Sequence, residues 1–181
     1  EKGGLVSARN AGVAAASGEY IGYVDGDDWV ESNLLSKVSA NLVCEDIDVI
    51  NFNFYNYIDG TDTPELTGKF HGLYGIEQLK NEVFPALICN LQTSFFEFGV
   101  IPAVWCKFYK AELLRRNLCL NTKITFGEDV ACAYSCLLQS KKILFIDDCL
   151  YHYRRNRASM TKAYSAKMFE NCNELLNYLD E

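Results

Sequence analysis

Hydrophobic and polar residues alternate along this chain with two different periods. Apolar residues recur at three- and four-residue spacing in several segments, which predicts amphipathic helices. Runs rich in aromatic and β-branched residues predict strands between them. The helices are expected at 4–17, 31–44, 110–117, 128–139 and 163–180, with a less regular one near 74–90, and the strands at 20–25, 47–58, 104–109 and 142–153. The order helix, strand, helix, strand at the start favours a layered α/β architecture.

The helical periodicity also predicts which side chains face the core. The inward residues are expected to be Leu34, Leu35, Val38, Leu42 and Val43 in the helix at 31–44, Val130, Ala133, Tyr134, Leu137 and Leu138 in the helix at 128–139, and Met168, Cys172, Leu175, Leu176 and Leu179 in the last helix. The segment 59–72 is rich in turn-forming residues and is expected to lack regular structure, while 91–103 is ambiguous.

Length and composition indicate one globular domain over residues 1–181. The chain has 181 residues and a hydrophobic fraction of 49%, enough for a sizeable core. Its net charge of -7 argues against a nucleic-acid partner held through phosphate contacts. It contains no apolar run long enough to predict a membrane-spanning helix.

Eight cysteines and two histidines occur, without a C-x-x-C pair or the usual zinc spacings. We therefore predict free, mostly buried thiols in a reducing compartment.

The stretch YIGYVDGDDW, residues 20–29, raises the first chemical question, because a predicted strand ends in three acids within four residues. Ligands of open α/β sheets bind outside the carboxyl ends of strands. Asp25 and Asp27 there could hold Mg²⁺ or Mn²⁺ together with substrate phosphates. The alternative is a solvated turn in which Asp27 or Asp28 caps the next helix.

A second acidic pair, Glu128 and Asp129, follows Gly127 at a predicted helix start. Acids in the first turn complement the helix dipole, so a capping role is one interpretation. The other is a general base that takes a proton from a hydroxyl nucleophile.

The basic segment 151–161, YHYRRNRASMT, could form an anion site, or it could be an exposed turn after a strand. Arg9 in the first helix has the pattern of a solvated surface residue. Taken together, a cation site, an anion site and a base are what transfer from a phosphate-activated donor to a hydroxyl requires.

Four segments, taken in order, resemble bacterial family 2 glycosyltransferases. They are GGLVSARNAGVAAASGEYIGYVDGDDWV, WCKFYKAELL, FGEDVACAYSCLL and YHYRRNRASMT, which span nearly the whole chain. The resemblance implies a GT-A fold, a nucleotide-sugar donor that is commonly UDP-linked, a divalent metal and inversion at the anomeric carbon.

The resemblance also implies a role for each matching residue. Asp129 matches the catalytic base and Glu128 its support. The implied metal ligands are Asp25, Asp27 and His152, and the implied donor-binding residues are Arg9, Asn10, Asp25, Arg154, Arg157 and Ser159. Trp105 and Lys107 fall in a W-x-K block that shapes either the acceptor side or the core, and Asp28 matches a further acid.

Two family blocks, P-x-Y-N and D-D-G-S, do not occur in this sequence. We therefore expect a partial GT-A sheet without its upstream nucleotide-binding strands, and weak donor binding by this chain alone. The open sheet edge could then pair with another copy.

The acceptor is expected to be a carbohydrate or a lipid-linked sugar in cell-surface polysaccharide or glycoconjugate synthesis. The protein would work in the cytoplasm or peripherally at the inner face of the membrane. Two alternatives remain open, a non-catalytic sugar- or nucleotide-binding module and a metal-dependent phosphate-ester hydrolase.

Overall fold

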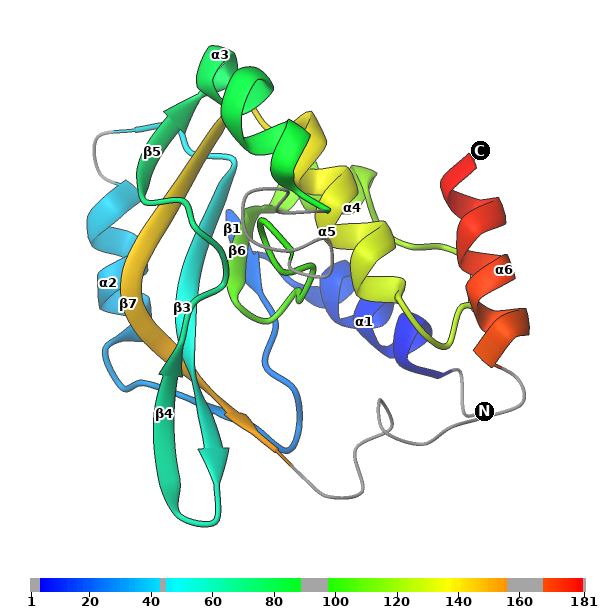
Figure 1. Ribbon diagram of the computed structural model, residues 1–181, viewed down its shortest axis with the longest axis horizontal. Coiled ribbons are helices and arrows are strands. Elements are labelled where there is room, and N and C mark those ends of the chain that lie inside the picture. Colours follow the sequence, from blue (N-terminus) through cyan, green and yellow to red (C-terminus); the bar gives the residue numbers. More distant parts are fainter. Residues whose placement is uncertain (1–3, 43–44, 89–97, 156–167, 181) are drawn as a thin grey trace.

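The computed structural model describes residues 4–42, 45–88, 98–155 and 168–180, in which a single curled sheet lies between helices (Figure 1). The strand order is β1-β6-β3-β7-β2, and β4 and β5 pair beside β3 and β7. The strands are β1 (Tyr20–Gly22), β2 (Trp29–Val30), β3 (Val49–Ile58), β4 (Thr61–Glu65), β5 (Gly72–Gly75), β6 (Lys107–Lys110) and β7 (Lys142–Arg154). The mixed α/β prediction is confirmed.

The parallel pair β3 and β7 forms the centre of the sheet, and the other strand pairs are antiparallel. Val49 faces Ile143 at one end of the pair and Tyr57 faces Arg154 at the other, with the register shifting between Phe52 and Phe54. The first six residues of β3 are all buried, as expected for a strand covered on both faces. The segment 142–153 is therefore one continuous strand rather than two.

Helices cover both faces of the sheet (Figure 1). They are α1 (Gly4–Ala15), α2 (Leu34–Leu42), α3 (Ile76–Gln78), α4 (Ala111–Arg116), α5 (Glu128–Gln139) and α6 (Met168–Asp180). Residues of α2 pack in one core cluster with Phe52, Trp105 and Tyr151, whereas α1, α4 and α5 share another with Val49 and Tyr109. After α3 the chain continues as a π-helical turn, Leu79–Val83, and a 3₁₀ turn, Phe84–Ala86, which contains Pro85, so the helix expected near 74–90 is irregular, as predicted.

Three predictions about local structure are wrong. The segment 59–72 contains β4, a fully exposed strand that pairs with β3. Leu35 is 70% exposed and Leu138 is 53% exposed, although both were expected to face the core. In α5 the inward positions are instead taken by Cys132 and Cys136, because the buried face of that helix is rotated from the expected one.

Leu176 and Leu179 of α6 are also exposed, although they too were expected to face the core. That helix packs through Leu175 and Tyr178 onto a third cluster that includes Val6 and Ile124. Val43 lies outside the described residues, and the side chain of Met168 is not described.

The cysteine prediction is confirmed for the part of the chain that the structure describes. Cys106, Cys119, Cys132 and Cys136 are free and buried, and Cys149 and Cys172 are free and half-buried. Within the same residues, no helix combines the length and apolarity needed to cross a membrane. The outer edge of β1 pairs with no other strand of the described sheet.

Candidate active site

The acid loop, defined as Asp25–Asp28, lies between β1 and β2. The regular strand ends at Gly22, three residues earlier than predicted. The Asp28 N–H donates to the Asp25 carbonyl at 3.1 Å, which closes the turn. Gly26 has no positive φ, and a Cβ there would meet nothing within 4 Å, so the turn does not require glycine at this position.

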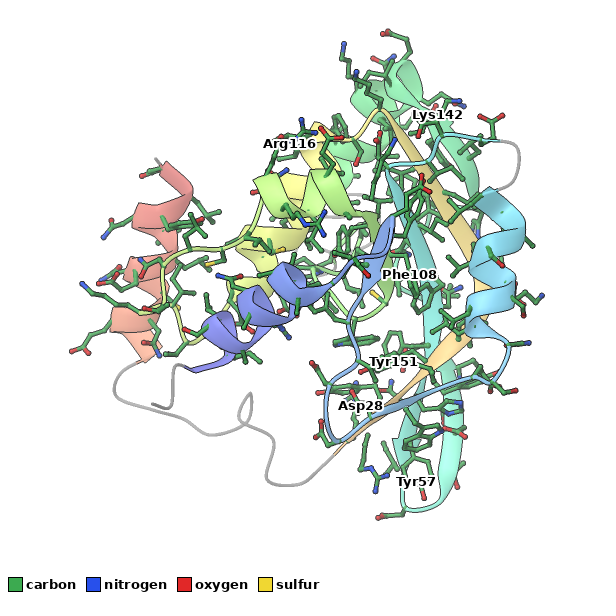
Figure 2. The ribbon with its side chains drawn as sticks, turned by 180° about the vertical axis from the view of Figure 1, so that it is seen from behind. Asp28, Tyr57, Phe108, Arg116, Lys142 and Tyr151 are labelled. Atoms are coloured by element: carbon green, nitrogen blue, oxygen red, sulfur yellow. The ribbon has the colours of Figure 1, made fainter. Side chains whose placement is uncertain are left out.

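The end of β7 holds this loop in place. The Tyr151 hydroxyl accepts a hydrogen bond from the Asp25 N–H at 3.0 Å and donates one to Asp28 Oδ2 at 2.8 Å (Figure 2). The Arg154 N–H donates to Asp28 Oδ1 at 2.8 Å, and Arg154 Nε donates to the Asp27 carbonyl at 3.0 Å. Asp28 is thus engaged on both carboxylate oxygens.

Glu128 and Asp129 occupy the first turn of α5. Gly127, which precedes them, has φ 82° and ψ 14°, a left-handed conformation that favours glycine. It turns the chain so that both acids begin the helix, where the helix dipole favours negative charge. The Val104 N–H lies 3.4 Å from Asp129 Oδ2 and contributes a further donor.

Arg9 of α1 joins the two acidic groups. Its Nη1 contacts Asp129 Oδ1 and lies 3.1 Å from Glu128 Oε1, while its Nη2 lies 3.5 Å from Asp25 Oδ1. The Arg9 side chain is only 13% exposed. Burial acts to lower the pKa of Arg9, but the charges of Asp129, Asp25 and Glu128 outweigh it and raise that pKa. The expectation of a solvated surface arginine is therefore wrong, because three carboxylates surround it.

Burial raises the pKa of three carboxyl groups of the site, those of Asp25, Asp28 and Glu128. Burial raises the pKa of Asp25, with Arg9 opposing it. Burial, with the neighbouring charge of Asp129, raises the pKa of Glu128, and Arg9 again opposes it. Burial also raises the pKa of Asp28, which the hydrogen bonds from Arg154 and Tyr151 counteract. Arg9 thus favours the ionised forms of Asp25 and Glu128.

His152 is turned to a different set of acids. Its ring is stacked between Trp29, at 4.8 Å between centroids, and Tyr55, at 4.9 Å. Its Nδ1 lies 3.0 Å from Asp62 Oδ1, and its Nε2 lies 3.1 Å from Glu31 Oε1. Both ring nitrogens are thus engaged away from the acid loop.

In the described part of the chain, no group of three or more His, Cys, Asp or Glu side chains is arranged so that it could hold a metal ion. Asp25 and Asp27 nevertheless fit Mg²⁺ or Mn²⁺ as a partial set, because such ions are bound through one or two carboxylates plus substrate phosphates. His152 is not brought together with them. The carboxylates of the acid loop are thus the residues that could hold a metal.

The remaining predicted residues fall in several places. Asn10 Nδ2 donates to the Cys119 carbonyl at 2.9 Å and ties α1 to the segment before α5. The guanidinium of Arg154 lies 5.1 Å from the centroid of the Trp29 ring. Arg157 and Ser159 lie outside the described residues.

The W-x-K block belongs to the core, one of the two expected outcomes. Trp105 stacks on Tyr151 with centroids 4.5 Å apart. Lys107 is fully buried, and its Nζ donates to the carbonyls of Ile101 and Ala103, both at 2.8 Å. This fixes the turn that carries Val104 to Asp129.

A small cavity opens behind the Arg9 cluster, lined among others by Asn10, Tyr23, Glu128 and Cys132. Tyr151 and Tyr23 are the residues near the site that sequence reasoning missed as functional. Alternation along 151–153 indicated only that Tyr151 points opposite to His152, and no local pattern connected it to the acid loop.

Comparisons with known proteins identify the family of this chain. The model of Glycosyl transferase family 2 matches residues 1–108. An uncharacterized glycosyltransferase, EpsJ of Bacillus subtilis (strain 168), is 32% identical over 164 residues, covering 88% of this chain and 44% of that protein. Glycosyltransferase GlyG of Streptococcus pneumoniae serotype 4 is 31% identical over 165 residues, covering 89% of this chain and 52% of that protein.

Among solved structures, S. aureus TarS 1-349 in complex with UDP-GlcNAc superposes with a TM-score of 0.65 at 20% sequence identity. The match covers 98% of this chain and 47% of that one. The chain thus shares the fold of TarS, and the predicted GT-A fold is confirmed. The chain belongs to glycosyltransferase family 2, and it spans about half the length of the curated relatives it matches.

Proposed function

We propose that the whole protein to which this chain belongs transfers a sugar from a nucleotide-sugar donor, UDP-linked, to an acceptor hydroxyl with inversion at the anomeric carbon, and that this chain by itself is inactive. The observation that carries the proposal is the Arg9 cluster, which brings Asp25 of the acid loop beside Glu128 and Asp129. A group suited to bind a charged donor and a group suited to accept a proton therefore lie around one guanidinium. The bound UDP-GlcNAc of the TarS structure supports the choice of a UDP-linked donor.

Asp129 is the proposed general base. Arg9 faces one of its oxygens and the Val104 N–H faces the other, so two donors fix the direction of the carboxylate. It takes the proton of the acceptor hydroxyl as that oxygen forms a bond to C1 of the sugar. The bond from C1 to the diphosphate oxygen breaks with its electron pair leaving on UDP, and one such displacement inverts C1.

The other residues support this step. Glu128 shares Arg9 with the base and so limits how far the guanidinium can move. Asp25 and Asp27 are the residues that would hold Mn²⁺ or Mg²⁺. When bound, the ion offsets negative charge on the departing diphosphate. Arg9 and Asn10 are proposed to lie beside the nucleotide, and the donor-binding set is completed by Arg154, Arg157 and Ser159.

Titration calorimetry of UDP, with and without Mn²⁺, tests the donor site in the protein as its gene encodes it. We expect metal-dependent binding that Asp27→Asn weakens at least tenfold, because one of two carboxylate ligands is lost. Asp46→Asn is the matched control, since Asp46 pairs with Lys110 on the surface. If UDP affinity were the same with and without Mn²⁺ in every variant, the proposed donor site would be refuted. The acids of the loop would then only cap a turn.

Product analysis separates the transferase from its two alternatives. A transferase releases UDP rapidly only when an acceptor sugar is added, whereas a phosphate-ester hydrolase transfers to water at the full rate. A non-catalytic module would bind the donor and turn over neither way.

The acceptor is proposed to be a carbohydrate or lipid-linked sugar of a cell-surface polysaccharide or glycoconjugate. We propose that the transfer takes place in the cytoplasm or peripherally at the inner face of the membrane. Pairing of two copies through the outer edge of β1 is a further proposal, and sedimentation velocity at rising protein concentration tests it.

A further inference from the structure

The acid loop contains three carboxylates, but they are held in different ways. Asp25 lies against Arg9, whereas Asp28 receives hydrogen bonds on both oxygens, from the Tyr151 hydroxyl and the Arg154 N–H. Both Asp28 oxygens thus accept hydrogen bonds from residues of β7, which ties this carboxylate to the strand. Asp28 therefore has a different task from its neighbours.

Tyr151 is suited to fix this loop because its own position is strongly determined. It is fully buried on the central strand β7, and its ring stacks on Trp105 at 4.5 Å with an interplanar angle of 21°. Its hydroxyl can donate one hydrogen bond and accept another at the same time. The hydroxyl contacts both ends of the turn, the N–H of Asp25 and the carboxylate of Asp28.

We propose that Tyr151 and Asp28 form a clamp that positions Asp25 and Asp27 for the donor's metal, and that Asp28 is a positioning residue rather than a metal ligand. This inference rests on the proposed function, because the clamp is assigned to the metal side of that reaction. The Arg154 backbone N–H completes the clamp on the second oxygen of Asp28.

The same support reaches the proposed base. The N–H of Val104 faces Asp129. The next residue is Trp105, whose ring stacks on Tyr151. Lys107 holds this turn through the carbonyls of Ile101 and Ala103. One short segment thus sets the base on one side and, through Tyr151, the acid loop on the other.

Three variants test the clamp. Tyr151→Phe removes only the hydroxyl and retains the ring on Trp105, and Asp28→Asn retains the size of the side chain. The double variant tests whether the two act as one unit. Tyr153→Phe is the control, because Tyr153 stacks on the same indole at 5.4 Å but makes no hydrogen bond to 25–28 within the described structure.

The first measurement is the dissociation constant of Mn²⁺ at saturating UDP in the protein as its gene encodes it. We expect Tyr151→Phe and Asp28→Asn each to weaken Mn²⁺ binding about tenfold, the loss typical of a hydrogen bond to a charged group. The dissociation constant of Mn²⁺ for the double variant should be no more than about threefold higher than that of the single variant with the lower affinity, because both substitutions break the same clamp. UDP affinity without metal should stay within about twofold, as should all values for Tyr153→Phe.

Two outcomes would overturn the clamp. If Asp28→Asn lost Mn²⁺ affinity more than about a hundredfold while Tyr151→Phe stayed within about twofold, Asp28 would be a metal ligand. If the effects of the two single variants multiplied in the double variant, the residues would act independently.

Amide hydrogen exchange separates failure of the clamp from failure of the proposed function. If the wild-type protein showed no metal-dependent UDP binding, the proposed function would be refuted but the clamp would not. The Asp25 amide should still exchange at least about tenfold faster in Tyr151→Phe than in wild type or Tyr153→Phe, because its acceptor is gone. Equal exchange in all three would overturn the clamp whatever the protein binds.

Discussion

Asp25–Asp28 and Glu128–Asp129 are both acidic groups beside a glycine, but the chain positions them by different means. The first group lies in an irregular loop and is held by Tyr151 and Arg154, both distant in sequence. The second begins a helix whose backbone start is set by Gly127, its immediate neighbour, and only the direction of the Asp129 carboxylate depends on the distant Arg9 and Val104. Substitutions next to Glu128 and Asp129 should therefore disturb the proposed base. The proposed metal ligands of the acid loop should instead be sensitive to substitutions far away in the sequence.

Removal of the proposed base should give the largest effect. Asp129→Asn retains the size of the side chain but cannot accept the proton, so we expect the transfer rate to fall about a thousandfold. Metal-dependent UDP binding should change less than about threefold, which calorimetry would show. Glu128→Gln is the matched control, with an expected loss of about tenfold. A rate above a tenth of wild type for Asp129→Asn would assign the proton transfer to another group.

Arg9→Gln should affect both acidic groups together, because it removes their shared cation. We expect a loss of about 2–3 kcal/mol in the free energy of unfolding at neutral pH, since several partly buried carboxylates lose their counter-charge. Arg116→Gln is the control, because its pair with Glu112 lies on the surface. Urea denaturation measures both.

The sign of the pH dependence follows from the raised pKa values of Asp25 and Glu128. Groups with a raised pKa in the folded protein stabilise it fully below their unfolded pKa of about 4, and this stabilisation is lost as pH rises through the folded pKa. Without Arg9 both values rise further. The cost of Arg9→Gln should therefore be smaller at pH 4.5 than at pH 7.5, and an equal cost at both would contradict the charge cluster.

The two glycines give the smallest and most direct test of the comparison. Gly127→Ala should destabilise the protein by about 1–2 kcal/mol, because a side chain at positive φ is strained. Its Cβ would also lie 2.5 Å from Leu175 Cδ2. Gly26→Ala should stay within about 0.5 kcal/mol, since a Cβ there meets open space. Thermal unfolding decides, and equal costs would remove the distinction between local and distant control.

Sequence patterns predicted the features that neighbours in the chain determine. The helix Glu128–Gln139 was predicted with its bounds, because glycine, two acids and a periodic apolar face all coincide there. Strand β4 was missed because all five of its residues are exposed, and Pro64 among them argues against a strand. Only pairing with β3 makes it one.

The site shows the same division. The acids were found as pairs because they lie close together in sequence. Arg9 was predicted as a donor-binding residue, but its contacts with three carboxylates were not, since nothing in a helix of small residues indicates that these acids converge on its arginine. The direction of His152 could not be predicted either, because Glu31 and Asp62 come from two other segments.

The clamp also has a consequence for the order in which the protein assembles. Tyr151 follows Asp25 by 126 positions, and the parallel pair β3 and β7 joins segments almost as far apart. Such long-range parallel pairing closes slowly, and chains leave the ribosome from their N-terminus. The acid loop therefore leaves the ribosome before β7 but acquires its hydrogen bonds only after β7 has been made.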